Sequence, residues 1–299
     1  AMYGGLAYFV ASDAGGSYHL WRTDGTAAGT EVFVAHIGSS TAVTSYGGFL
    51  WFQGWDEVHG GEPWISDGTE AGTMLLADLE PGAGGSAPDG FTGLGNRVYF
   101  SAFTTALGTE LFASDGTAPG TVQVADIEPG AGGSYPAQLT AFGNLLLMSA
   151  TETTSGRELW RSDGSGIGTY MIEIRPGAEG SDPAFYGEAG GAMLFRASDG
   201  STGRELWKTN GASALQVADL NPGHFDGLDS SGEGLSHGDF VYFQGDDGSS
   251  GDELWRSDGT AAGTTQVADI RTGSAGSKPE HFVQVGSWLA FAADDGVHG

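Results

Sequence analysis

Carboxylate side chains recur beside glycine-rich turns in this sequence, a combination that suits either cation binding or acid–base chemistry. The pattern is an Asp, then a glycine-rich turn, then a Glu on the next strand. Calcium takes about six to eight oxygen ligands, which Asp side chains and the carbonyl groups of such turns can supply. Solvated hairpin acids are the ordinary interpretation of this pattern, and structural calcium, the one cofactor that the pattern suggests, is the alternative. The candidate ligands are Asp246, Asp247, Glu253, Asp199, Glu205, Asp56 and Glu62.

Carboxylates could also serve a carbohydrate-active enzyme, as the acid and base of a hydrolase or lyase. The sequence contains no HExxH, GxSxG or phosphate-binding-loop motif and no paired Cys. Its 7 His are scattered and show no metal-ligand spacing. We therefore predict no catalytic residue and no enzymatic activity, with a hydrolase or lyase that uses carboxylates on a propeller face as the alternative.

A second set of acids opens a recurring Asp-Gly-Thr phrase or its close variants. Asp in such a position can accept hydrogen bonds from the backbone N–H groups just ahead, and the following Gly can adopt a positive φ. One copy has Asn210-Gly211 instead, which keeps the turn chemistry and removes the charge. This substitution favours a structural turn role for Asp24, Asp67, Asp115, Asp163 and Asp258.

The acids belong to a repeated unit, of which Glu253–Thr264 (ELWRSDGTAAGT) is the clearest copy. A fixed period of about 20–50 residues is typical of propellers, solenoids and repeat arrays. We expect the aromatic residue of each copy to pack between neighbouring units, where a large ring fills the space. These aromatic residues, spaced 43, 48, 48, 47 and 48 positions apart, are Trp21, Trp64, Phe112, Trp160, Trp207 and Trp255.

One unit contains four predicted strands, which is the content of a propeller blade. The apolar runs Arg97–Ala102, Leu145–Ala150 and Trp288–Ala293 do not alternate with polar residues, so both faces of their strands should be buried. A blade between two neighbours provides that environment. The prediction is an all-β protein, a single β-propeller domain over 1–299 with four-stranded antiparallel blades.

The blade count follows from seven predicted second strands and six third strands. We predict six full or nearly full blades and a partial seventh, in a chain that is a piece of a longer repeat protein. Closure of the ring on six or on seven positions stays open. The expected blade-sized units are 1–37, 38–79, 80–127, 128–174, 175–220, 221–270 and 271–299.

Composition excludes several classes of function. The 38 acidic and 11 basic residues give a formal net charge of −27, which argues against binding to a nucleic-acid backbone. The absence of Cys excludes disulfides and thiolate zinc sites. No apolar run of about 18 residues is present, so we predict no membrane insertion. The start of the chain also shows no signal-peptide pattern.

The full repeat, best preserved in Glu253–Ser277, is ELWRSDGTAAGTTQVADIRTGSAGS. It resembles the bacterial ELWxxDGT-repeat family, whose pattern continues as GTxxVxDIxPGxxGS. The chain departs from that pattern at Tyr18-His19, Pro63 and Phe112, and in the eroded copy Glu205–Ala214. The resemblance implies a propeller-like fold and an extracellular or cell-surface location in bacteria. It implies no established reaction and no catalytic residue.

Uniform repetition favours a non-enzymatic module for binding, adhesion or scaffolding, because a single active site would leave one copy chemically distinct. The expected partner is a protein or a glycan, or further copies of the chain joined through open blade edges. A calcium-stabilised matrix or filament-forming protein is a further alternative.

Overall fold

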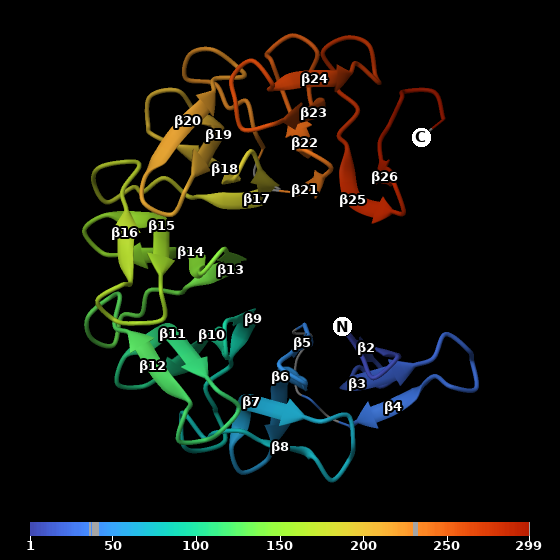
Figure 1. Ribbon diagram of the computed structural model, residues 1–299, viewed down its shortest axis with the longest axis vertical. Helices are drawn as coiled ribbons and strands as arrows, with labels where there is room; N and C mark the ends of the chain where they lie inside the picture. The colour runs from blue at the N-terminus through green and yellow to red at the C-terminus, as the bar shows by residue number, and fades with distance from the viewer. Residues whose placement is uncertain (36, 38–41, 230–232, 299) are drawn as a thin grey trace. The chain divides into compact units, whose positions relative to one another are not determined.

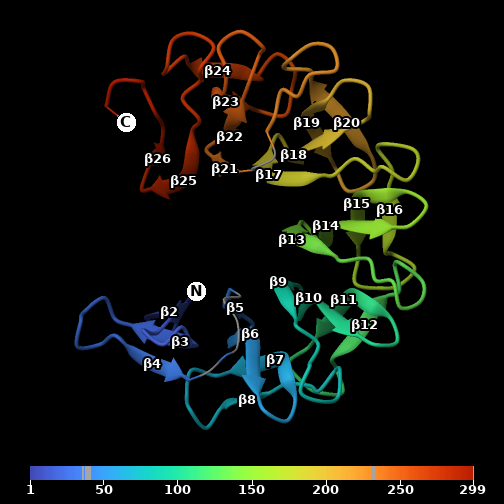
Figure 2. The same cartoon turned by 180° about the vertical axis from the view of Figure 1, so that it is seen from behind.

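The computed structural model describes residues 1–35, 37, 42–229 and 233–298. Within these residues the fold is all-β, with six four-stranded antiparallel sheets and one two-stranded sheet (Figure 1, and from behind in Figure 2). In each sheet the strands lie side by side in chain order. This is a β-propeller of about seven blades, so the predicted fold class is confirmed. No helix of the described chain is long and apolar enough to cross a membrane.

Contacts divide the chain into two compact units. The first comprises Ala1–Thr151 and Arg161–Tyr170. Its complete sheets contain β1 (Met2–Tyr3), β2 (Leu6–Ser12), β3 (Tyr18–Thr23), β4 (Glu31–Val34), β5 (Thr44–Tyr46), β6 (Phe49–Asp56), β7 (Gly60–Ser66), β8 (Thr73–Leu75), β9 (Asp89–Leu94), β10 (Arg97–Thr104), β11 (Gly108–Ser114) and β12 (Val122–Ala125).

The second unit comprises Glu152–Trp160 and Met171–Gly299. The fourth sheet, through which the division runs, contains β13 (Ala137–Phe142), β14 (Leu145–Glu152), β15 (Gly156–Ser162) and β16 (Tyr170–Ile172). The sheets that follow contain β17 (Ala184–Ala189), β18 (Ala192–Ser198), β19 (Arg204–Thr209), β20 (Ala214–Ala218), β21 (Gly234–His237), β22 (Phe240–Gly245), β23 (Glu253–Ser257), β24 (Thr265–Ala268), β25 (Glu280–Val285) and β26 (Trp288–Ala292).

The second strands of the blades follow the apolar runs. In β10 and β14 the residues of the run are buried on both faces, as predicted. The run Trp288–Ala293 contradicts this prediction, because β26 alternates between exposed and partly buried residues and Trp288 is 77% exposed. The reason is that β26 pairs only with β25 in its sheet and lacks the third and fourth strands that cover its equivalents.

The core consists of clusters that join consecutive sheets. Phe112 of β11 packs with Trp51 of β6 and Phe91 of β9, so it fills the space between the second and third sheets. Trp207 packs against a cluster of the fourth and fifth sheets, and Trp255 against one of the fifth and sixth. In these copies the aromatic residue lies in, or packs against, a cluster whose members come from two consecutive sheets.

Candidate functional site

The Glu of each ELW phrase is completely buried, although it reads as a surface acid in the sequence. These residues lie on β7, β11, β15, β19 and β23 and are Glu62, Glu110, Glu158, Glu205 and Glu253. Glu62 accepts hydrogen bonds from the backbone N–H groups of Leu79, Glu80 and Ser86 at 3.2, 3.1 and 2.9 Å. The Ser86 hydroxyl donates to the same carboxylate at 2.5 Å. Each Glu therefore anchors the loop that follows the fourth strand of its own repeat.

The same network recurs with little change in the other well-preserved copies. Glu110 accepts from Ser134 N at 2.9 Å and from Ser134 Oγ at 2.7 Å, in addition to two N–H groups of the loop. Ser181 Oγ and Ser277 Oγ each donate to their Glu at 2.6 Å. The Glu and the Ser of the repeat, 23 or 24 positions apart, thus form one structural unit.

Two glycines allow the loop to approach the strand this closely. A Cβ at Gly60 would lie 2.7 Å from the backbone of Gly85, and a Cβ at Gly85 would lie 2.4 Å from the N atom of Gly61. Both glycines have positive φ, 69° and 66°. Side chains at these positions would push the loop away from Glu62.

The fifth copy has lost one member of this network. Glu205 accepts from Leu220 N at 2.6 Å and from Gly227 N at 2.9 Å, but Gly227 occupies the place of the Ser and has no hydroxyl. Burial raises the pKa of Glu205 to about 8, and the charge of Asp219 adds to the effect. Burial also raises the pKa of Glu62 and Glu110, and there a Ser hydroxyl opposes the shift.

The Asp of the Asp-Gly-Thr phrase forms a closed turn. In the fourth copy, Asp163 Oδ1 accepts from Ser165 N at 3.0 Å and from Ser165 Oγ at 2.7 Å. Both hydrogen bonds lower the pKa of Asp163, and the one from the Ser165 hydroxyl has the larger effect. A Cβ at Gly168 would lie 2.0 Å from Asp163 Oδ1, which explains the second Gly of the phrase. Asn210 accepts from Ala212 N and Ser213 N in the same way, as the turn interpretation requires. The equivalent bonds form at Asp24, Asp67, Asp115 and Asp258.

The predicted calcium ligands fall into two separate networks. The Asp members cap their own hairpin turns. Asp56 accepts from Val58 N and His59 N, and Asp199 from Ser201 N and Thr202 N. The Glu members, Glu62, Glu205 and Glu253, face the loop beyond the fourth strand instead.

The hairpin of the sixth copy has two such acids. Asp246 accepts from Gly248 N at 2.8 Å. Asp247 accepts from the N and Oγ atoms of both Ser249 and Ser250, and the Ser250 backbone bond is the largest of the causes that lower its pKa to about 2. Among the described residues, no group of three or more Asp, Glu or His is placed to hold a metal ion. The candidate calcium ligands therefore form no grouped set in this part of the chain, and their oxygens accept internal hydrogen bonds instead.

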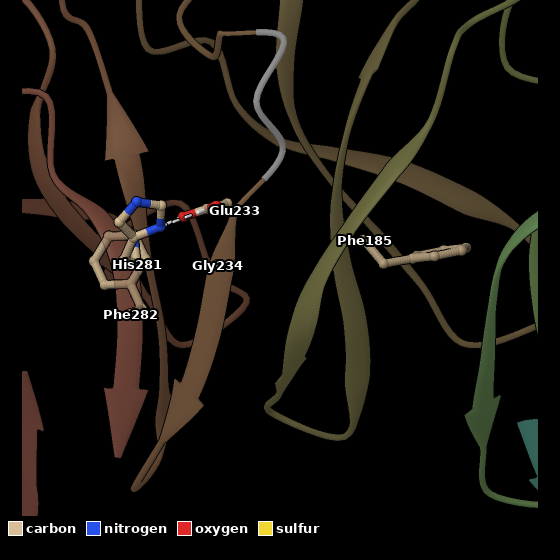
Figure 3. A pocket seen from close by; sticks show the side chains of 5 residues that line it. All are labelled: Phe185, Glu233, Gly234, His281 and Phe282. Atoms are coloured by element: carbon tan, nitrogen blue, oxygen red, sulfur yellow. Dashed lines mark hydrogen bonds and ion pairs between the residues drawn. The ribbon is translucent and has the colours of Figure 1, made fainter. Parts of the chain in front are cut away.

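A cavity of about 230 Å³ lies in the second unit, where the first strands β17, β21 and β25 begin. Figure 3 shows Glu233 and His281 turned toward each other beside Phe282, while Phe185 extends from β17 in the other direction. The backbone N–H of His281 donates to Glu233 Oε2 at 2.7 Å, and its ring Nδ1 lies 3.7 Å from Glu233 Oε1. The His281 ring is largely exposed, and its Nε2 lies 3.8 Å from Glu280 Oε1. The cavity thus presents the aromatic rings of Phe185 and Phe282 for packing, and the Glu233 carboxylate and His281 ring for hydrogen bonds to a ligand.

Three of these lining residues, Phe185, Glu233 and His281, occupy equivalent positions in their blades, and this position was not predicted. It is Gly90, Gln138, Phe185, Glu233 and His281 in successive blades. A bulge in the first strand lies here, and Gln138 and His281 have positive φ, 55° and 59°. The repeat pattern does not reveal this position, because the residue here changes from blade to blade while the residues that define the repeat stay the same.

No family model matches this chain, and no curated protein does. Solved structures with a similar fold include a puromycin hydrolase S511A mutant complexed with PGG, with a TM-score of 0.58 and 15% identity over 98% of this chain and 49% of that chain. A Mycobacterium tuberculosis puromycin-hydrolyzing peptidase has a TM-score of 0.58 and 11% identity, with 95% of this chain and 46% of that chain covered. The computationally designed Ika8 protein has a TM-score of 0.52 and 14% identity, with 97% and 80% covered.

These likenesses describe the fold alone, because the identities are low. The chain spans about half the length of the two hydrolases.

Proposed function

We propose that this chain is a non-enzymatic repeat module that binds a partner at a bacterial cell surface or in an extracellular matrix. The observation that supports this most is that the repeat contains two kinds of position, one that is repeated and internally hydrogen-bonded and one that varies from copy to copy. Acids that could do chemistry form the same internal hydrogen bonds in copy after copy, for example Glu62 with Ser86 and Glu110 with Ser134. Positions that differ between copies include the start of the first strand, as at Gln138, Glu233 and His281, and the following hairpin turn, as at Asn96 and Asp239.

A repeated scaffold whose side chains vary at fixed positions is suited to recognising a partner. Repeat folds present binding surfaces on which each unit contributes its own side chains, and connecting segments carry function more often than the frame does. Membership of the ELWxxDGT-repeat family, and the extracellular location that it implies, are part of this proposal.

The alternative of a carbohydrate-active enzyme has less support. Its acid and base would need carboxylates that reach a glycosidic bond. The repeated Glu side chains are 0% exposed and bonded to the backbone. The repeated Asp side chains close their own turns.

Binding and turnover can be tested together. The purified chain is mixed with washed bacterial cells or their isolated surface polysaccharide and sedimented, and the supernatant is assayed for new reducing ends and unsaturated sugars. We expect saturable co-sedimentation that is lost after heat unfolding, with no sugar product. Product that accumulates in proportion to time and protein concentration would contradict the proposal, and so would the absence of saturable binding.

A further inference from the structure

The hairpin turns of consecutive blades enclose a second kind of cavity. Between the β5–β6 turn and the β9–β10 turn, both in the first unit, lies a cavity of about 250 Å³. We name it the aromatic notch and define it by the residues Tyr46, Phe49, Trp51, Asn96, Arg97 and Asp115.

The apolar wall of the notch is held rigidly. Trp51 is 3% exposed, and its Nε1 donates to the carbonyl O of Tyr46 at 3.1 Å. The Tyr46 hydroxyl donates across to the carbonyl O of Gly95 in the next blade at 2.9 Å. A Cβ at Gly93 would lie 2.0 Å from the Tyr46 ring, so the ring rests directly on the backbone. Phe49, 38% exposed, leaves an aromatic surface open to a ligand. Such fixed rings lose little conformational entropy on binding.

The polar side of the notch offers both donors and acceptors. Within the described chain, neither the Asn96 amide nor the Arg97 guanidinium has a hydrogen-bond partner. Asp115 uses Oδ1 for its turn, where it accepts from Thr117 N at 3.0 Å and Thr117 Oγ1 at 2.7 Å. Its Oδ2 accepts no hydrogen bond in this part of the chain. The charges of Arg97 and Asp115 balance, so the notch carries no net charge of its own.

The same place in the second unit has different chemistry. The turns β17–β18 and β21–β22 enclose about 420 Å³, lined by Glu188, Ala189, Asp239, Asp258 and glycines. Here Ala189 takes the place of Tyr46, and Asp239 that of Asn96. No aromatic residue lines this cavity. The notch is therefore a repeated feature of the frame, whereas the ring-and-amide combination belongs to one copy.

We propose that the aromatic notch binds one neutral hexose unit of a polysaccharide. The C–H face of a sugar ring packs on Phe49 and Tyr46, and its hydroxyl groups pair with Asn96, Arg97 and Asp115. The cavity is smaller than the ~300–1,000 Å³ of sites for drug-sized ligands, which suits a single ring. A neutral sugar fits better than a uronate, because the site has no net charge and the −27 charge of the chain repels polyanions. This inference rests on the proposed function and names its ligand class.

Calorimetric titration of the whole chain with neutral gluco-, galacto- and mannooligosaccharides tests this assignment, with oligogalacturonate as the charged comparison. Phe49→Ala and Asn96→Ala should weaken binding of the neutral sugar by about tenfold or more. Asp239→Ala, the matched change in the second unit, should leave it unchanged. All three positions are exposed, and unchanged melting temperatures would show that the variants fold.

Three results would overturn the assignment: no neutral sugar binds, oligogalacturonate binds more tightly, or Asp239→Ala weakens binding as much as Asn96→Ala. If the panel fails while saturable binding to cells persists, the notch assignment alone is wrong. If both fail, the proposed function is wrong as well.

Discussion

At the scale of single residues, the buried Glu of each third strand solves two problems together. A buried carboxylate is costly unless its oxygens are hydrogen-bonded, and a tight loop leaves backbone N–H groups without strand partners. In the second and third copies the Glu accepts hydrogen bonds from two N–H groups of the loop after the fourth strand and from a third at the Ser. The side chain and the loop thus satisfy each other, which explains why the Glu is invariant in copies two to six.

Removing the Ser hydroxyl tests this account. Ser134→Ala leaves the Glu110 carboxylate with one donor fewer in a buried site. We expect the free energy of unfolding to fall by about 1.5–3 kcal/mol, the range for a hydrogen bond to a charged group, and the pKa of Glu110 to rise further. Chemical denaturation measures the first effect. The exposed Ser213→Ala is the control, and equal losses in both variants would contradict the assigned role.

Glu205 should make stability depend on pH. An unfolded Glu titrates near its ordinary value of 4.5, whereas folded Glu205 has a pKa of about 8. The folded state therefore binds this proton more tightly, so its stabilising effect is complete below pH 4.5 and is lost as the pH rises through 8. From about pH 6 to about pH 9 we expect the free energy of unfolding to fall by about 3 kcal/mol through this group.

Glu205→Gln removes that titration, so its free energy of unfolding should fall less over the same interval. Denaturant unfolding at both pH values, for the native chain and the variant, measures the difference. Parallel curves would mean that Glu205 ionises normally in the folded state.

At the scale of elements, the Asp-Gly-Thr turn is determined almost entirely by local bonds. Asp163, Ser165 and Thr169 bond within one turn, and Gly168 is needed because a side chain there would meet the carboxylate. This locality is why the turn could be predicted from the sequence. The second strands were predictable for a similar reason, since each is a continuous apolar run.

Substitutions at Asp163 follow from this geometry. Asp163→Asn keeps an oxygen that accepts both bonds from Ser165, so the melting temperature should stay nearly unchanged, as the natural Asn210 indicates. Asp163→Ala loses both bonds and should lower it measurably. Differential scanning calorimetry compares the two, and an equal loss in both variants would show that the charge matters rather than the turn.

Features that depend on distant segments were not predictable from the sequence. The burial of Glu62 depends on Ser86, which comes 24 positions later on another loop. The aromatic notch combines two hairpins about one repeat apart. The exposure of Trp288 contradicts its apolar pattern because burial depends on neighbouring strands.

At the scale of the whole molecule, the net charge of −27 destabilises the folded state, because the acidic side chains repel one another. Sodium chloride screens this repulsion, with a Debye length of about 10 Å at 0.1 M. We expect the melting temperature to rise from low salt to about 0.15 M. A constant or falling melting temperature over this range would show that the acids do not repel one another appreciably in the folded chain.

The central claim is that the repeated acids are internal hydrogen-bond acceptors and that recognition belongs to the variable positions. Thermal unfolding in excess calcium, in equal magnesium and with a chelator, all at matched ionic strength, tests it most directly. A ligand at a hundred times its dissociation constant that binds only the folded state adds about 2.7 kcal/mol. We predict the same melting temperature in all three solutions. A rise of several degrees in calcium alone would show that the Asp and Glu residues form ion sites and would contradict this account.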